Sequence, residues 1–274
     1  MSEEIDIKSI RNIVAAVKDT YNFDFGNYAI TSFKRRIERV LSVFNCKNVD
    51  ELIEKIKEDK IFFESFLKEI TVNTTEMFRD PSFWRKLRED VLPLIATHQN
   101  IRIWHAACSS GEEVYSMAIL LKEMDLLDRT QIIATDINQD VISIAKKGIY
   151  AIRNMELNQS NYERFAGKGM LSDYFSENDG FACMDRSLIA NVNFRTHDLV
   201  LGSSFSKFDL ILCRNVLIYF NMTLQDRVVE LFSNSLFKNS FLAVGSKETI
   251  AWCKSIDKFS TFSIEEKIYQ KIKE

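Results

Sequence analysis

The sequence predicts an α/β protein in which a small helical domain precedes a doubly wound, mostly parallel sheet. Between residues 101 and 245, short apolar runs of strand length alternate with amphipathic runs of helix length, which is typical of parallel sheets with helices on both faces. Before residue 71, apolar residues recur at helical spacing and are separated by short polar connections. The 274 residues are enough for one large domain and a smaller one.

Four groups of apolar residues predict the helices of the N-terminal domain. They extend over residues 10–21, 30–44, 49–56 and 62–70. After Ile70 the chain becomes polar and β-branched in "TVNTTEMFRDPSFW", which we interpret as a linker leading into a further helix. Asp80 and Pro81 predict the start of that helix, because aspartate is favoured as an N-cap and proline at the first helical position.

The alternation that follows predicts the elements of the sheet. Strands are expected at residues 101–107, 131–136, 192–199, 208–213 and 240–245, and helices at residues 111–124, 139–150 and 223–236. The alternating pattern at residues 259–272 predicts a terminal hairpin. Residues 151–191 interrupt the rhythm and hold three of the eight glycines, so we interpret them as an insertion of short antiparallel strands.

The composition argues against several classes of protein and site. A net charge of −3 gives no electrostatic reason to expect nucleic acid or a membrane as a partner. No apolar stretch approaches the roughly 18 to 20 residues that span a bilayer, and the acidic start does not resemble a secretion signal. Five scattered cysteines without a C-x-x-C pair fit the cytoplasm, where we expect the protein to work. Three histidines without ligand-like spacing predict no metal site.

The first predicted strand ends in "HAACSSGEE", which indicates a particular kind of ligand. Ligands of open α/β sheets bind at the carboxyl ends of the strands, beside unpaired N–H groups of the following helix. A dinucleotide needs several glycines near its pyrophosphate, whereas this loop has only Gly111, which also disfavours an NAD enzyme. Glu112 and Glu113 would repel a phosphate and attract a cation. Alternatively, the two glutamates only complement the helix dipole.

The second predicted strand ends in "ATDIN", where Asp136 occupies the position from which a carboxylate accepts the hydroxyls of a ribose. Its alternative role is the N-cap of the next helix, although Asn138 could fill that role instead. The two strand ends together suggest an adenosyl ligand without phosphates. S-adenosylmethionine (SAM) fits, because its sulfonium and ammonium groups would be attracted to Glu113. Cys108 and Cys213 lie near strand ends, but a cysteine there is more often a small buried hydrophobe than a nucleophile.

Four stretches, "NTTEMFRDPSFW", "IWHAACSSGEEVYSMAI", "ATDINQDVISIAKKGIY" and "FDLILCRNVLIYF", follow one another along the chain. In this order they resemble the motifs of the chemotaxis receptor methyltransferase (CheR) family, and "YAITSFKRRIERVL" resembles the family's N-terminal helical domain. The resemblance extends over nearly the whole chain. It implies a helical domain at residues 1–70, a linker at 71–84 that contributes to the cofactor site, and a Rossmann-like class I methyltransferase domain at 85–274 with an inserted β-subdomain at about 151–191.

The resemblance also implies an activity and a partner. Members of the family transfer a methyl group from SAM to glutamate side chains in the cytoplasmic helices of chemoreceptors, which forms methyl esters and leaves S-adenosylhomocysteine. We expect a monomer and, because the inserted stretch is short, no tether to a receptor pentapeptide. Two alternatives remain open: a methyltransferase of the same architecture that acts on another signalling protein, and a regulatory module that only binds the cofactor.

Individual residues take roles from the same resemblance. Arg79 and Tyr219 match the active-site residues. The positions that match the family's cofactor contacts are Asn73, Thr75, Arg79, Glu113, Asp136, Asp198, Leu199, Arg214 and Asn215. The family usually has asparagine at the position of Asp198, which puts the chemistry of that contact in doubt. For Arg214, the alternative is an arginine paired with a carboxylate purely for structure.

Arg35, Arg36 and Arg39 form a basic cluster on the second predicted helix. With the apolar side of that helix toward the core, Arg35 and Arg39 are expected on the opposite side and Arg36 beside them. The receptor segments that the family methylates are acidic helices, so this surface is a candidate for docking them. An ordinary solvated helix face is the alternative.

Overall fold

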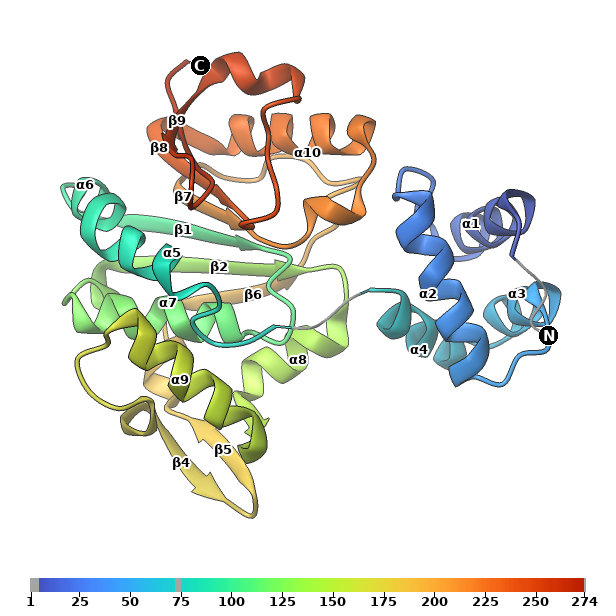
Figure 1. Cartoon of the computed structure of the whole chain (residues 1–274), viewed down its shortest axis with the longest axis horizontal. Helices are drawn as coiled ribbons and strands as arrows, with labels where there is room; N and C mark the ends of the chain where they lie inside the picture. Colours follow the sequence, from blue (N-terminus) through green and yellow to red (C-terminus); the bar gives the residue numbers. More distant parts are fainter. Residues whose placement is uncertain (1–4, 72–74, 274) are drawn as a thin grey trace. The chain divides into compact units, whose positions relative to one another are not determined.

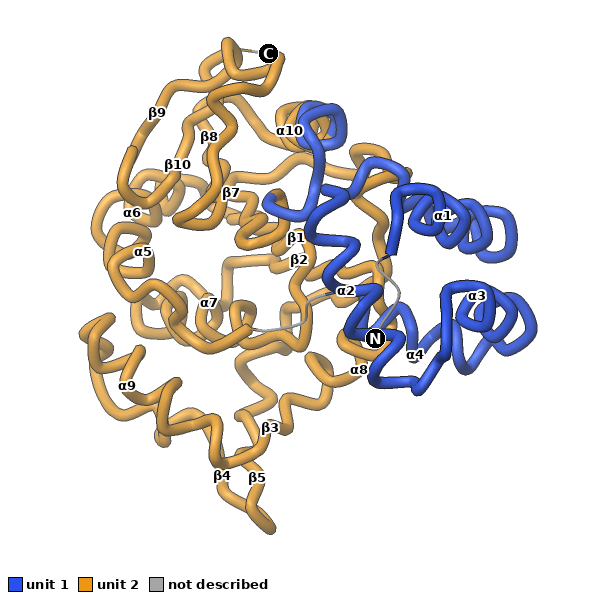
Figure 2. Tube along the Cα trace, turned by 45° about the vertical axis from the view of Figure 1, so that its right-hand side comes forward, with its two compact units in different colours: residues 1–73, 218–227 blue, residues 74–217, 228–274 orange. Residues whose placement is uncertain are grey.

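The chain folds into two compact units, which Figure 2 shows in different colours. Unit 1 consists of residues 1–73 and 218–227, and unit 2 of residues 74–217 and 228–274. The structure is a computed structural model that describes residues 5–71 and 75–273. Among these residues, no helix combines the length and the apolar character needed to cross a membrane.

Unit 1 contains the four predicted N-terminal helices. They are α1 (Ile7–Tyr21), α2 (Ile30–Val43), α3 (Val49–Glu58) and α4 (Lys60–Ile70). Three of them begin at a polar N-cap: the side chains of Asp6, Asn48 and Asp59 accept hydrogen bonds from N–H groups of the first turn. Their apolar faces form one buried core, in which the rings of Tyr21 and Phe63 stack 3.7 Å apart.

Unit 1 also includes residues 218–227, which are far from its helices in sequence. The Ala29 N–H donates to the Tyr219 carbonyl, and the Asn221 N–H donates to the Asn27 carbonyl, both at 2.9 Å. The rings of Tyr28 and Phe220 meet edge to face at 5.3 Å. Asn27 and Asn221 are 194 positions apart, and no local pattern in the sequence predicts that these segments pair.

Unit 2 is built on a seven-stranded sheet in the order β6-β2-β1-β7-β8-β10-β9. The strands are β1 (Ile101–Ala106), β2 (Thr130–Asp136), β6 (Val192–Thr196), β7 (Phe208–Cys213), β8 (Leu236–Val244), β9 (Phe259–Ser263) and β10 (Ile268–Lys271). Strands β6, β2, β1, β7 and β8 are parallel, whereas β10 is antiparallel to both β8 and β9. The doubly wound sheet and the terminal hairpin are therefore confirmed. The winding reverses between β1 and β7, which is the usual place for a ligand.

The α-helices of unit 2 include the predicted ones after β1, β2 and β7 (Figure 1). They are α5 (Pro81–Lys86), α6 (Leu92–Ile95), α7 (Glu112–Glu123), α8 (Gln139–Lys147), α9 (Met155–Phe165) and α10 (Met222–Ser235), whose first residues belong to unit 1. A π-helical turn at Leu87–Val91 joins α5 to α6. Neighbouring residues of β1 face opposite sides of the sheet: Ile103 joins the core that contains α7, and Trp104 packs edge-on against Phe232 of α10.

Short 3₁₀ helices occupy several of the connections. They lie at Leu127–Arg129, Ile152–Asn154, Leu171–Tyr174, Arg186–Ile189, Leu217–Tyr219 and Lys254–Lys258. The predicted helix at residues 139–150 ends earlier, at Lys147, because Gly148 takes a left-handed conformation with φ of 62°. A Cβ atom at Gly148 would lie 2.2 Å from the Tyr115 hydroxyl, so glycine is required where α8 ends.

The insertion forms a small antiparallel sheet in the order β3-β5-β4, as predicted. Its strands are β3 (Ile149–Ala151), β4 (Phe175–Asn178) and β5 (Phe181–Met184). The insertion also contains α9, which the sequence pattern does not predict. Two asparagines, Asn158 and Asn161, lie on the buried side of α9 and interrupt its apolar stripe. They are buried because they bond the backbone N–H and carbonyl of Met77, at 3.0 and 3.1 Å.

Candidate functional site

A series of ion pairs lies at the carboxyl ends of β1 and β7, where the sheet winding reverses. Arg214, which follows β7, places Nη2 2.6 Å from Asp80 Oδ2 and Nη1 3.3 Å from Glu113 Oε2. The other oxygen of Glu113 is 2.9 Å from Nδ1 of His105. The Arg214 guanidinium also lies 4.0 Å from the centre of the Phe83 ring. Two carboxylates and an aromatic ring thus compensate the burial of an arginine at the end of a core strand.

Glu113 carries a fixed negative charge in the first turn of α7. Burial alone would raise the pKa of its carboxyl, but the hydrogen bond and charge of His105 and the charge of Arg214 bring that pKa below its ordinary value. Its side chain keeps 19% exposure, so the carboxylate is not fully enclosed. This arrangement suits a cationic group of a ligand.

Glu112, the neighbouring residue, has a different environment. Its side chain accepts a hydrogen bond from the Ser110 hydroxyl at 2.7 Å, and the residue is only 8% exposed. Burial raises the pKa of Glu112 to about 7. The two glutamates of the loop are therefore not equivalent, because only Glu113 is paired with Arg214 and His105, which lower the pKa of its carboxyl.

Asp80 is the N-cap residue of α5, as predicted, but its side chain does not bond the first turn of the helix. Pro81 does occupy the first turn, whereas Asp80 adopts a left-handed conformation with φ of 56° and its side chain makes no capping hydrogen bond. The carboxylate bonds Arg214 instead. The N-cap position of Asp80 is confirmed, but a long-range ion pair with Arg214 takes its side chain away from the N–H groups of the helix.

Asp136, at the end of β2, connects the loops that follow β1 and β2. Its carboxylate oxygens accept from the Ser109 N–H at 2.9 Å and the Asn138 N–H at 3.0 Å. Burial raises the pKa of the Asp136 carboxyl, and the backbone N–H groups offset part of that rise. The N-cap of α8 is Asn138, which accepts from the Asp140 N–H at 2.9 Å. Asp136 thus lies buried at the carboxyl end of β2, and Asn138 takes the role of N-cap.

The turn after β1 brings its residues close to α8. Gly111 has φ of 95°, and a Cβ atom there would lie 2.7 Å from the Ala145 Cβ atom. The single glycine of the loop is therefore needed for helix packing and for a left-handed turn. Cys108 lies in the same turn. Burial, together with the charges of Asp136 and Glu113, raises the pKa of the Cys108 thiol well above its ordinary value, which argues against a nucleophile.

Tyr219 lies in unit 1, where its ring covers a buried arginine. The guanidinium carbon of Arg36 is 4.0 Å from the centre of the Tyr219 ring, and Nη1 donates to the Ile70 carbonyl. Arg36 is 6% exposed, so the prediction that it lies on the exposed docking surface is wrong. The buried positions of α2 are 33, 36, 37 and 40, and Arg36 occupies one of them.

Arg35 and Arg39 lie on the exposed side of α2, as predicted. Arg39 Nε donates to Glu69 Oε2 at 3.3 Å. In Arg36, by contrast, the Nε and Nη2 atoms are buried and have no hydrogen-bond partner within residues 5–71 and 75–273. Burial lowers the pKa of the Arg36 guanidinium, and the neighbouring Tyr219 offsets part of that shift.

The other predicted residues are spread over several loops. Asn73 lies outside the described residues. Thr75 and Arg79 are half-buried and precede α5, and the Arg79 carbonyl accepts from Trp84 Nε1 at 2.9 Å. Asp198 Oδ1 accepts from the Val200 N–H at 2.7 Å. Leu199 is buried, and Asn215, which follows Arg214, has φ of 63°.

Three residues near the site were not predicted. Asp80 and His105 belong to the ion-pair series, and Glu248 accepts a hydrogen bond from the Asn215 N–H at 2.9 Å. Of these three residues, His105 could have been found from the sequence, because it lies near the end of the first predicted strand. No local pattern indicates Asp80 or Glu248 as site residues, because their partners are distant in sequence.

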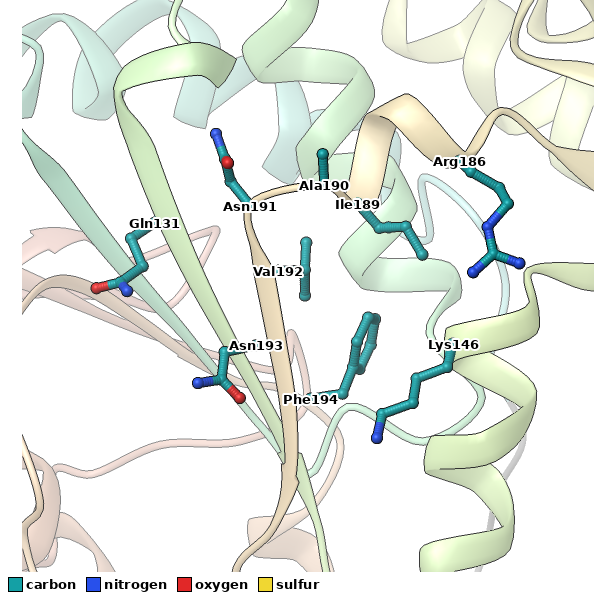
Figure 3. A pocket seen from close by; sticks show the side chains of 9 residues that line it. All are labelled: Gln131, Lys146, Arg186, Ile189, Ala190, Asn191, Val192, Asn193 and Phe194. Atoms are coloured by element: carbon teal, nitrogen blue, oxygen red, sulfur yellow. The ribbon is translucent and has the colours of Figure 1, made fainter.

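A groove of about 580 Å³ follows the edge strand β6 and contains none of the predicted residues. Lys146 of α8 and Arg186 of the insertion extend toward it, as Figure 3 shows. The candidate site is therefore distinct from this groove. No group of three or more metal-ligating side chains was found among the described residues.

Two family models match the chain in the order of its domains. The all-alpha domain of CheR methyltransferases matches residues 8–71, and the SAM binding domain of the same family matches residues 73–268. The chain belongs to the CheR methyltransferase family. It is accordingly a SAM-dependent methyltransferase, and the ionised Glu113 beside a partly open ligand edge fits a cofactor with cationic groups.

Curated relatives cover most of this CheR chain. A "Putative methyltransferase Cher3" of Pseudomonas putida is 43% identical over 96% of this chain and 96% of its own. A "Chemotaxis protein methyltransferase" of Listeria monocytogenes is 32% identical over 85% of this chain and 87% of its own. A protein of the same name from Borreliella burgdorferi is 30% identical over 90% of each chain.

Proposed function

We propose that this CheR protein methylates glutamate side chains in the cytoplasmic helices of chemoreceptors. The observation that carries the proposal is the ordered match of both family domains between residues 8 and 268, together with relatives named chemotaxis protein methyltransferases. The product would be a glutamate methyl ester, which serves adaptation in chemotaxis.

In this proposal, the residues at the ligand edge of unit 2 hold the cofactor. Glu113 faces its ammonium group, Asp136 accepts the ribose hydroxyls, and Asp198 with Leu199 flanks the adenine. Arg214 and Asn215 line the cofactor at the end of β7, and Asn73, Thr75 and Arg79 contribute from the segment before α5. The support from the structure is that Glu113 is kept ionised and that Asp136 and Arg214 lie at strand ends.

The bound cofactor supplies an electrophilic methyl group on a positively charged sulfur. A substrate glutamate has an ordinary pKa well below 7 and is already ionised at neutral pH, so this chain needs no general base. The carboxylate and the sulfonium both lose charge during transfer. The residues of this chain would therefore act by positioning the carboxylate and excluding water.

Tyr219 and Arg79 are the residues we propose to position the substrate carboxylate. A tight bidentate grip by an arginine would stabilise the ground state and slow the reaction, whereas a tyrosine hydroxyl holds the carboxylate more gently. The Arg36 guanidinium behind the Tyr219 ring adds a positive charge with unused donors in unit 1. An anionic side chain would be attracted there.

The exposed residues Arg35 and Arg39 are the ones we propose to dock the acidic receptor helix. Their side of α2 carries positive charge, although Arg39 is paired with Glu69. Such surface charges act on the encounter with an acidic partner more than on the chemistry.

Methylation of a receptor fragment tests the proposal. The full chain is incubated with methyl-labelled SAM and the cytoplasmic fragment of a chemoreceptor from the same organism. We expect label on the fragment that is released by mild base, as a methyl ester is, and no label when the methylated glutamates are replaced by glutamine. Base-stable label, or no label although SAM binds, would contradict the proposal.

A second candidate is a CheR-type methyltransferase that acts on another signalling protein. One observation favours it: the relative with 43% identity carries no reference to chemotaxis in its name. Base-labile label on another protein and none on any receptor fragment would support this alternative. Cofactor binding without turnover on any protein would instead indicate a regulatory module.

A further inference from the structure

Glu248 joins the ends of two neighbouring parallel strands at the ligand edge of unit 2. Its Oε2 atom accepts from the Gly245 N–H at 2.5 Å, directly after β8, and from the Asn215 N–H at 2.9 Å, two residues after β7. Glu248 is 4% exposed, and its own N–H closes the turn by donating to the Gly245 carbonyl at 2.8 Å. One buried carboxylate thus fixes how the chain leaves both strands.

The backbone that Glu248 holds is an unfavourable one for most residues. Asn215 has φ of 63°, a left-handed conformation that asparagine tolerates better than most side chains. A charge-assisted hydrogen bond from its N–H to the carboxylate stabilises this conformation. Gly245 is required opposite, because a Cβ atom there would lie 2.8 Å from the Asn215 N and Nδ2 atoms and from Glu248 Oε2.

The turn at Asn215 decides where the residue before it points. Arg214 reaches Glu113 and Asp80 from the end of β7. Three residues after Asn215, at Ile218, the chain enters unit 1. We propose that Glu248 is a positioning residue of the methyltransferase, which holds the left-handed turn at Asn215 so that Arg214 and Asn215 are presented to SAM. This inference rests on the cofactor contacts proposed above for those two residues.

The competing explanation is that Glu248 only stabilises the fold, as any buried and bonded carboxylate does. Glu123 provides a matched control. It is 7% exposed, lies at the other end of α7 from Glu113, and accepts from the Tyr162 hydroxyl at 2.6 Å and the Lys168 N–H at 3.3 Å. Loss of either carboxylate should lower the melting temperature, but only one of them holds a proposed cofactor contact.

The test compares SAM binding by calorimetry, well below the melting temperature, for the full chain with Glu248→Ala, Glu248→Asp, Glu248→Gln or Glu123→Ala. We expect Glu248→Ala to weaken SAM binding about tenfold to a hundredfold, the equivalent of one or two charge-assisted hydrogen bonds. Glu248→Gln keeps an acceptor oxygen at the same distance from the backbone and should weaken SAM binding about threefold. In Glu248→Asp the side chain is too short to accept from both the Gly245 and the Asn215 N–H groups, so SAM binding should be weaker than in Glu248→Gln. Glu123→Ala should stay within about twofold of the wild type.

Several results would overturn the proposal. Wild-type SAM affinity in folded Glu248→Ala would do so, and so would equal loss of affinity in Glu248→Ala and Glu123→Ala at equal loss of melting temperature. If Glu248→Ala does not fold, the other two variants test the proposal. It is overturned if Glu248→Asp binds SAM as tightly as Glu248→Gln or more tightly. Failure of the proposed function would look different, because the wild type would bind SAM and leave the receptor fragment unmethylated.

Discussion

Replacing Glu112 by glutamine should stabilise the protein in a way that depends on pH. Glu112 is 8% exposed, and burial raises its pKa from an ordinary 4.5 to about 7. The folded protein therefore holds this proton more tightly than the unfolded chain. As the pH rises from about 4.5 to about 7, the unfolded chain loses the proton first, and the free energy of unfolding falls. Above about pH 7 the free energy of unfolding does not fall further through this residue.

The size of the effect follows from the shift. The pKa of Glu112 is higher by about 2.5 in the folded protein than in the unfolded chain, and each unit is worth about 1.36 kcal/mol, so ionisation lowers the free energy of unfolding by about 3 kcal/mol. Glu112→Gln removes the ionisation and keeps an oxygen to accept from Ser110. We therefore expect the variant to exceed the wild type in unfolding free energy by up to about 3 kcal/mol at pH 8, and to match it near pH 4.5, where the wild-type residue is protonated.

Urea unfolding of both proteins at pH 4.5, 6 and 8 measures this difference. Glu113→Gln is the control on the adjacent residue, and its effect on the free energy of unfolding should have the opposite sign. The pKa of Glu113 is lowered, so its charge stabilises the fold above its unfolded pKa, and this contribution is lost as the pH falls through the folded pKa. Glu113→Gln should thus be destabilising at pH 8 and less so in acid. A Glu112→Gln difference that does not change with pH would refute the reasoning.

Further predictions concern the cofactor site, one helix cap and the substrate. Asp136→Ala should abolish detectable SAM binding by calorimetry and leave the circular dichroism unchanged; near wild-type affinity would contradict its role. Asn138→Ala should cost about 1 kcal/mol of unfolding free energy, the value of an N-cap, and no change would show that α8 does not need it. Tyr219→Phe should slow single-turnover methylation about tenfold to a hundredfold at saturating SAM, because a hydroxyl is lost while the ring still packs; a wild-type rate would make the tyrosine structural. Arg35→Glu with Arg39→Glu should weaken receptor methylation but not SAM affinity, and added salt should have the same effect on the wild type; insensitivity to both would remove this surface from docking.

Much of the fold can be predicted from local pattern. Strand β7 occupies residues 208–213 as predicted, because a strand buried on both faces is one continuous apolar run. Asn138 caps α8 as an available alternative to Asp136, since a cap needs only neighbouring residues. The helix α9 was missed because Asn158 and Asn161 lie on its buried side, where their hydrogen bonds to Met77 replace apolar contacts.

The sequence by itself determined the order of most elements and the family, because these depend on hydrophobic period and on motifs that are continuous along the chain. Only the tertiary structure decided what the charged side chains do. Arg214 pairs with Asp80 and Glu113, Arg36 is buried under Tyr219, and residues 218–227 join unit 1. The physical reason is that a buried charge is tolerated only with partners, and those partners come from segments that the local pattern does not relate.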